Sequence, residues 1–301
     1  MRKRSHTIAY HTMMLPGVII LAIFSIIPII GNIIAFQRYN PLAAFFGLAS
    51  KFVGLQNFRT IFLMHPDSMQ VIINTLIIAV TKIIMSLVVP VMFALFLNEV
   101  LNRLVKRSIQ TVVYLPYFLS WVIAGAMFRQ IFSTSGILNS ALLGVGALKE
   151  PIMFLASNFW FRPIVVFTEV WKSFGYNAII YIAAITTIDM NLYEAAEIDG
   201  ANRWKKMWFI TLPGIMPTIV LLSTLALGNV LNAGFDQIFN MYNPIVYQTG
   251  DVLDTFVYRI GLVNMQFQLA TAVGLSKSVI SMLLIILSYK LADKLAGYKI
   301  F

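Results

Sequence analysis

Long apolar stretches separated by shorter polar segments dominate this chain. A helix that crosses a bilayer needs about 20 mostly apolar residues, and six stretches reach that length. They run approximately over residues 13–36, 71–97, 108–132, 164–186, 212–231 and 271–291. Because we find no internal repeat and no low-complexity linker, the pattern predicts one all-α membrane domain over residues 1–301 with six transmembrane helices.

Several of these stretches carry prolines, which remove a backbone donor and kink or interrupt a helix unless neighbours compensate. They include Pro28, Pro90 and Pro116. Breaks of this kind suit a helix bundle around a cavity. For any single proline, a kink that faces lipid is an equally good interpretation.

The composition agrees with a membrane protein. Of the 301 residues 59% are hydrophobic and 11% are charged, and the mean hydropathy is +0.82, so the bilayer is the expected solvent. The absence of cysteine excludes disulfides, thiolate metal sites and a cysteine nucleophile. The histidines His6, His11 and His65 have no spacing suited to a metal or a catalytic pair. An intramembrane enzyme is therefore disfavoured.

The formal net charge of +10 reflects membrane topology better than nucleic-acid binding, because the cations lie in short clusters between apolar stretches. With the N-terminus inside, the inner segments hold twelve cations and the outer segments six. This asymmetry predicts that both termini are cytoplasmic. The first stretch is longer than a signal-peptide core and lacks a small-residue cleavage site, so we expect a retained helix.

The polar segment between the fourth and fifth stretches, about residues 189–213, predicts a short helix, a turn and re-entry into the membrane. Good helix formers occupy residues 194–198, Gly200 permits a turn, and Pro213 is expected to mark the start of the next helix. Small side chains here would let another protein approach closely. A helix resting on lipid, anchored by Trp204 and Trp208, is the alternative.

This segment resembles the signature loop of ABC-importer permeases, in which a glutamate, two alanines, an aspartate-glycine-alanine and a later leucine-proline recur at this spacing. The matching residues are Glu194, Ala195, Ala196, Asp199, Gly200, Ala201, Leu212 and Pro213. The resemblance implies a coupling helix that sits in a cleft of the cytoplasmic ATPase and transmits its ATP-driven closure. Met207 departs from the phenylalanine that is frequent in the sugar-importer branch.

Other segments extend the resemblance over most of the chain. The chain is similar to binding-protein-dependent carbohydrate permeases of the maltose-importer class, in the branch that serves oligosaccharides from complex polysaccharides and includes the permeases of alginate import. The segments are residues 54–58 (GLQNF), 74–76 (NTL), 114–116 (YLP), 236–244 (DQIFNMYNP) and 250–255 (GDVLDT).

The resemblance implies a type I ABC-importer permease fold with six transmembrane helices, in a bacterial cytoplasmic (inner) membrane. It also implies a second homologous permease, an ABC ATPase dimer, an extracytoplasmic solute-binding protein and an oligosaccharide substrate. The chain has no phosphate-binding glycine loop ending in lysine and serine or threonine. We therefore expect no cofactor and no catalysis in this chain, with ATP and magnesium held by the ATPase.

Ionisable residues in apolar stretches are costly and tend to face a cavity or a partner. The cations Lys82, Arg129, Lys172 and Lys277 outnumber the acids, of which Glu169 is the clearest. This favours an anionic substrate, alginate or another uronate-containing oligosaccharide, over a neutral one. Alternatively, Lys82 and Arg129 snorkel to an interface, and Lys172 pairs with Glu169 three residues away.

The candidate residues of the substrate pathway combine cations, amides and an aromatic ring, which suit sugar hydroxyls and an apolar ring face. Lys172 and Tyr176, four residues apart, are expected to share a helical face, as are Asn232 and Asp236, with Asn229 one turn earlier. Lys277 completes the set. These groups equally suit contacts between helices. A transporter driven by an ion gradient remains a second hypothesis, although the paired membrane acids that it would require are scarce.

Overall fold

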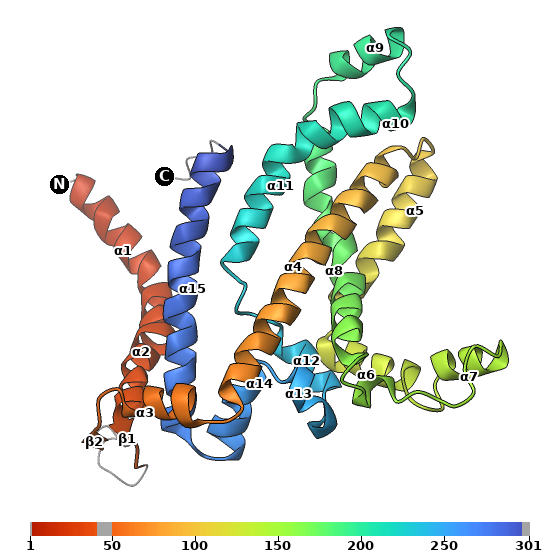
Figure 1. The fold of residues 1–301 in the computed structure, drawn as a ribbon. Helices are drawn as coiled ribbons and strands as arrows, with labels where there is room; N and C mark the ends of the chain where they lie inside the picture. The colour runs from red at the N-terminus through yellow and green to blue at the C-terminus, as the bar shows by residue number, and fades with distance from the viewer. Residues whose placement is uncertain (1, 41–49, 297–301) are drawn as a thin grey trace. The chain divides into compact units, whose positions relative to one another are not determined.

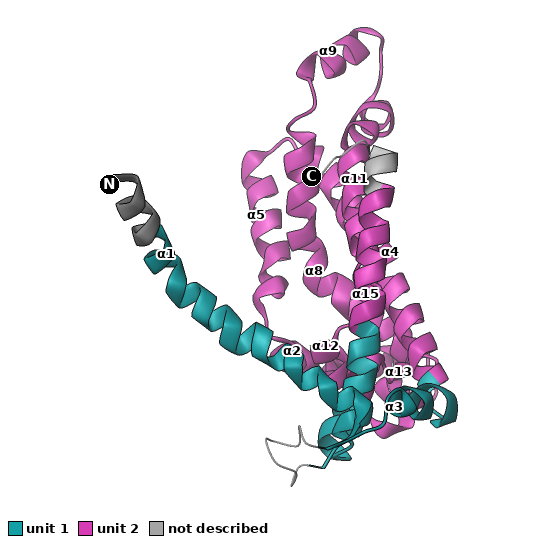
Figure 2. Ribbon diagram, turned by 90° about the vertical axis from the view of Figure 1, so that its left-hand side faces the viewer, with its two compact units in different colours: residues 1–68, 257–277 teal, residues 69–256, 278–301 magenta. Residues whose placement is uncertain are grey.

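The computed structural model describes residues 2–40 and 50–296 and is built almost entirely of helices (Figure 1). The chain divides into two compact units, shown in Figure 2. One unit contains residues up to 68 together with 257–277, and the other contains residues 69–256 together with those from 278 onwards. The prediction of one domain over the whole chain stays a prediction.

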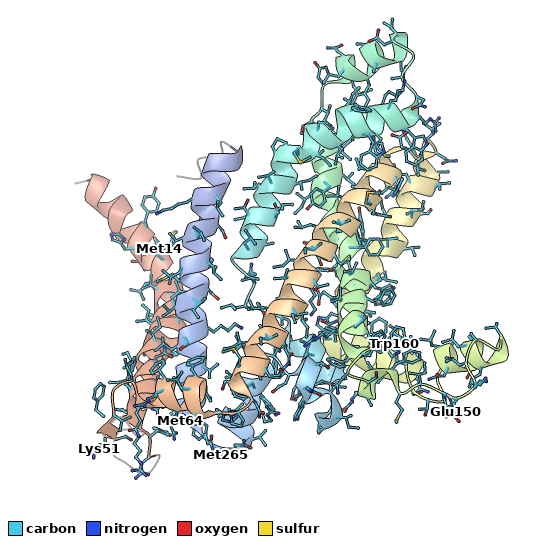
Figure 3. All side chains as sticks on the ribbon, viewed as in Figure 1. Met14, Lys51, Met64, Glu150, Trp160 and Met265 are labelled. Carbon is cyan, nitrogen blue, oxygen red and sulfur yellow. The ribbon has the colours of Figure 1, made fainter. Side chains whose placement is uncertain are left out.

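The first unit begins with an almost continuous helical run, α1 (Arg2–Leu21), a π-helical turn (Ala22–Ile26), α2 (Ile27–Gly31) and a 3-10 turn (Asn32–Phe36). Large apolar side chains on this run are exposed, including Met14, which is labelled in Figure 3. An exposed apolar surface of this extent suits contact with lipid.

A two-stranded antiparallel sheet follows, in which β1 (Gln37–Arg38) pairs with β2 (Lys51–Phe52). The buried Asn57 on α3 (Gln56–Arg59) donates to the carbonyl oxygens of Ala35 and Gln37, each at 2.9 Å. A π-helical turn (Thr60–Met64) continues α3. A third π-helical turn (Arg259–Val263) and the start of α15 (Phe267–Ala296) complete the unit.

The second unit holds the long central helices and the loops between them (Figure 1). Its elements are α4 (Ser68–Asn98), α5 (Arg103–Tyr114), α6 (Trp121–Ile131), α7 (Ile137–Gly144), α8 (Phe161–Ile185), α9 (Met190–Ile198), α10 (Arg203–Lys206), α11 (Leu212–Leu227), α12 (Phe235–Met241), α13 (Tyr247–Gly250) and α14 (Leu253–Tyr258), with 3-10 turns at Leu115–Phe118, Phe154–Ala156 and Pro244–Val246.

Among the residues that the structure describes, four helical segments are long and apolar enough to cross a membrane, or five if one bent pair counts as a span. The four are Tyr10–Phe36, Ser68–Asn98, Arg203–Leu227 and Phe267–Leu291. The third predicted stretch, residues 108–132, is bent, since Arg103–Phe118 and Trp121–Ile131 meet at 100°, and the break falls at Pro116 as expected. Pro116 lacks an N–H at this point, and Ser120 caps the new helix by accepting from the N–H of Ile123. The backbone therefore turns here while leaving few N–H groups without a hydrogen-bond partner.

The predicted fourth stretch forms α8, whose 25 residues extend about 37 Å. It carries Arg162, Glu169 and Lys172, yet it supplies buried side chains to three apolar clusters of the unit. Phe161 and Tyr181 are among these buried groups. The face of a helix that packs on protein tolerates polar residues that a lipid-facing surface does not.

The other prolines act differently from Pro116. Pro90 lies inside α4 without interrupting it, and Pro28 follows the π-helical turn in the first unit. The prediction that the next helix begins at Pro213 is confirmed, because α11 begins at Leu212 and has Pro213 in its first turn. A helical run also leads into α11 from the preceding loop. The helical run begins at Arg203, because Asn202 accepts from the N–H of Lys205 at 2.9 Å. A π-helical turn (Met207–Thr211) then precedes Pro213.

Replacement of Gly175 tests the close packing of α8 on α5. A Cβ atom at this position would lie well inside contact distance of the Val113 carbonyl oxygen. We expect Gly175→Ala to lower the free energy of unfolding by about 1–3 kcal/mol through overpacking, measured as a lower thermal midpoint in detergent. Gly144→Ala on α7, where a Cβ meets nothing within 4 Å, is the matched control. Equal midpoints for the two variants would contradict the packing.

Candidate functional site

A cavity of about 420 Å³, lined by both polar and apolar groups, lies within the second unit, among α4, α8, α11 and the chain that follows α11. Its wall is mainly apolar, with a small set of polar side chains. These are Lys82, Ser86, Glu169, Asn177, Tyr181, Asn229 and Asn232. Amides and hydroxyls both donate and accept hydrogen bonds, so the cavity can bind a hydroxylated molecule.

The segment between α11 and α12 leaves the helical path and borders the cavity. Gly234 has φ +91°, a left-handed conformation that favours glycine, and a Cβ there would lie 3.0 Å from the Lys82 Nζ atom. Asn229 and Asn232 are exposed on this segment. The prediction that Asn232 and Asp236 share a helical face is wrong, because α11 ends at Leu227 and α12 begins only at Phe235.

A buried ammonium group joins this segment to the long helices. The Nζ atom of Lys82 donates to the Ala233 carbonyl oxygen at 2.6 Å and to the side-chain oxygen of Gln237, and it lies 3.6 Å from a Glu169 carboxylate oxygen. The expected alternatives are therefore wrong: Lys82 does not snorkel, and Glu169 pairs with Lys82 and not with Lys172.

Gln237, on α12, belongs to the buried polar cluster formed with Lys82, Glu169 and the Ala233 carbonyl. The sequence alone did not single it out. Its amide nitrogen donates to the Val165 carbonyl oxygen and to the Thr168 hydroxyl, both at 2.7 Å. Gln237 lies within residues 236–244, and the resemblance of this segment to the family was the one sequence feature that pointed to it. Asn177, on α8, also lines the cavity and had no comparable signal.

Lys172 and Tyr176 share a helical face, as predicted, but this face meets the bend after α5 and does not line the cavity. The Lys172 ammonium donates to the Tyr117 carbonyl oxygen at 2.7 Å and lies 5.1 Å from the centre of its ring. Tyr176 stacks on Tyr117 with ring centres 3.9 Å apart. These residues stabilise the bend by hydrogen-bonding, cation–π and stacking contacts.

The other predicted pathway residues lie elsewhere. Asp236 is exposed in the first turn of α12 and does not line the cavity. Lys277 is half-buried on α15 and belongs to the first compact unit. Of the six candidates, the cavity brings together Asn229 and Asn232.

The predicted short helix and turn of residues 189–213 are confirmed as α9 and a left-handed Gly200 with φ +74°. Asp189 caps α9 by accepting from the N–H of Asn191 at 3.0 Å. The helix lies beyond the ends of α8 and α11, and none of its residues is buried (Figure 1). Glu194, Ala195 and Asp199 are exposed there, which leaves them accessible to a partner.

Two side-chain contacts tie this projecting loop to the helical run that begins at Arg203. The hydroxyls of Tyr193 and Thr211 lie 2.9 Å apart, and the Lys206 ammonium donates to the Glu197 carboxylate. The hydrogen bond and then the charge of Lys206 hold the pKa of Glu197 below its ordinary value. Since Thr211 lies in the π-helical turn before α11, the loop is linked directly to a transmembrane segment.

Removal of the Gln237 amide tests the buried cluster. Gln237→Met keeps the side-chain volume but leaves Lys82, Thr168 and a carbonyl oxygen with fewer partners. We expect the free energy of unfolding to fall by about 2–3 kcal/mol, measured as a lower thermal midpoint in detergent. Gln130→Met, at an exposed position of α6, should leave the midpoint unchanged. A stable Gln237→Met variant would show that the cluster contributes little.

Comparison with known proteins gives a consistent picture. Residues 86–296 match the family of binding-protein-dependent transport system inner membrane components. Protein LplB of Bacillus subtilis (strain 168) is 38% identical over 285 residues, covering 94% of this chain and 88% of that protein. The polygalacturonan/rhamnogalacturonan transport system permease protein YteP of the same organism is also 38% identical over 285 residues, covering 94% and 87%.

The fold matches that of a solved bacterial ABC transporter involved in the import of the acidic polysaccharide alginate. The TM-score is 0.88 with 33% sequence identity, and the match covers 98% of each chain. A structure of a bacterial alginate ABC transporter, in complex with a periplasmic protein that holds an alginate pentasaccharide, matches with the same TM-score and identity over 99% of each chain. The predicted type I permease fold and the resemblance to carbohydrate permeases are confirmed.

A transport permease in the inner membrane accounts for the apolar helices, the cavity and the projecting loop together. The chain belongs to the family of binding-protein-dependent transport system inner membrane components and is the permease subunit of a sugar ABC importer.

Proposed function

We propose that this chain forms, together with a second permease, the pathway for an anionic oligosaccharide, alginate or another chain that contains uronates. The observation that carries the proposal is the cavity within the second unit, whose wall presents Asn177, Asn229 and Asn232. The acidic character of the sugar is supported by two similarities, to a permease for polygalacturonan and rhamnogalacturonan and to an importer of alginate.

A neutral oligosaccharide is the second candidate, and one observation favours it. The cation that lines the cavity, Lys82, is paired with Glu169 and bonded to two further oxygens, so the wall offers amides to hydroxyl groups without a free positive charge. A lactose transport permease, LacF of Rhizobium radiobacter, is 29% identical over 225 residues, covering 75% of this chain and 73% of that protein.

We further propose that the projecting loop couples this chain to an ABC ATPase dimer, which would hold ATP and magnesium. The helix α9 exposes Met190, Leu192 and Ile198, the last to 87%. Exposed apolar groups beside small side chains such as Ala195 suit a docked protein, and a lipid interface is the alternative. In this arrangement both termini are cytoplasmic, and an extracytoplasmic solute-binding protein delivers the sugar on the opposite side.

ATP hydrolysis by the reconstituted complex tests the substrate. The permease pair and the ATPase are placed in lipid with a solute-binding protein loaded with uronate or neutral oligosaccharides of equal length. We expect stimulation by the uronate-loaded form. Stimulation by the neutral form alone would favour the second candidate. Uptake that needs an ion gradient at constant ATP, and stops with a protonophore, would instead indicate a secondary transporter.

Replacement of Gly200 tests the coupling role of the loop. Gly200→Val places a β-branched residue at φ +74°, in open space, so it strains the turn without a steric clash. We expect sugar uptake and its stimulation of ATP hydrolysis to fall at least about fivefold, which corresponds to roughly 1 kcal/mol of strain.

Gly146→Val is the matched control, because Gly146 has φ +72° and also lies in open space, after α7. It introduces the same backbone strain away from the projecting loop. Normal transport by Gly200→Val, or equal losses in both variants, would contradict the coupling role.

A further inference from the structure

We propose that the Lys82–Glu169 pair sets the charge of the cavity and thereby determines whether the permease accepts anionic or neutral oligosaccharides. The inference rests on the proposed function, in which the sugar passes through this cavity. It assigns a specificity-determining role to two residues, Lys82 on α4 and Glu169 on α8.

The charge of the cavity wall comes from two side chains. Lys82 and Glu169 are the charged side chains among the described residues that line the cavity, and every other lining group is neutral. A unit charge in a partly enclosed site acts over several ångströms, because the effective dielectric constant there is well below that of water. The balance between these two side chains therefore fixes the electrostatic potential that a sugar meets.

The two partners are unequally accessible. The Lys82 side chain is 8% exposed, whereas the Glu169 side chain is 27% exposed. A sugar in the cavity therefore meets the carboxylate more directly than the ammonium. Without Lys82 behind it, the wall would carry a negative charge and repel a uronate.

The ammonium is held in this position by groups other than Glu169. It donates to the carbonyl oxygen of Ala233 and to the side chain of Gln237, which Val165 and Thr168 hold in turn. Glu169 meets the ammonium at 3.6 Å. The arrangement therefore keeps a positive charge beside the carboxylate and leaves the wall close to neutral.

Removing either charge should therefore change the selectivity of the cavity in opposite directions. Lys82→Met leaves the Glu169 charge unbalanced and should disfavour a uronate, whereas Glu169→Gln leaves the Lys82 charge unbalanced and should favour it. For charges about 8–10 Å apart at an effective dielectric constant of about 20, each change is on the order of tenfold in relative affinity. A purely structural role would weaken both sugars alike.

Direct binding to the full complex tests the inference. The permease pair and ATPase are placed in lipid nanodiscs without solute-binding protein, so that only the permease selects. The probes are a uronate trisaccharide and its carboxyl-reduced, neutral counterpart of equal length. We expect the ratio of uronate to neutral affinity to fall about tenfold in Lys82→Met and to rise about tenfold in Glu169→Gln.

Two further variants separate charge from packing. Lys172→Met removes a cation that is held on Tyr117 and does not line the cavity, so the ratio should not change. The double variant Lys82→Met/Glu169→Met is neutral and should return the ratio to the wild-type value, even if both affinities fall. If Lys82→Met does not fold, Glu169→Gln and the double variant still give a ratio of uronate to neutral affinity. The test therefore does not depend on Lys82→Met.

The outcomes distinguish this inference from the proposed function. Wild-type binding of at least one probe, with the same ratio in every variant, would overturn the inference alone. A shift in the same direction for Lys82→Met and Glu169→Gln would also overturn it. If the wild type binds neither probe, the proposed function fails and the inference fails with it.

Discussion

A lysine ammonium buried among transmembrane helices must be neutralised and hydrogen-bonded, because the surrounding apolar groups cannot solvate it. Lys82 meets this requirement with partners from three parts of the chain: Glu169 on α8, the Ala233 carbonyl after α11, and Gln237 on α12. Each partner is thereby held near α4. The non-helical segment that carries Asn229 and Asn232 follows from this arrangement, since Gly234 lets the backbone approach the ammonium.

Close approach of helices is the second constraint on the same unit. Gly125 on α6 faces Asn240, Gly175 on α8 faces Val113, and Gly228 faces Ile285, in each case closer than a side chain would allow. Lipid does not drive helices together as water does, so small residues that permit extensive contact are a principal source of association. The central helix α8 can then hold a carboxylate and a lysine away from the bilayer.

The cavity and the projecting loop lie in one compact unit and share one helical run. The loop is tied by Tyr193–Thr211 and Glu197–Lys206 to the turns that precede α11, and the cavity lies where α11 ends. A displacement of the loop would therefore act on a segment that borders the cavity. This is the physical form that coupling between an ATPase and a sugar pathway would take in this chain.

The sequence by itself determined the features that depend on local chemistry. Apolar length predicted a helical membrane protein, and Gly200, with the helix formers before it, predicted the short helix and turn of the projecting loop. The matched motif residues identified the family before any contact was known.

Tertiary structure alone decided the features that depend on distant contacts. Lys82 and Gln237 are 155 residues apart, so no periodicity reveals that they meet, and the spacing of Glu169 and Lys172 suggested a pair that does not form. The 100° angle of the bend at residues 115–120, where Pro116 predicted only a break, and the end of α11 at Leu227 likewise depend on the packing of other segments. Hydropathy records how apolar a segment is, whereas the partner of each buried polar group is set by the three-dimensional arrangement.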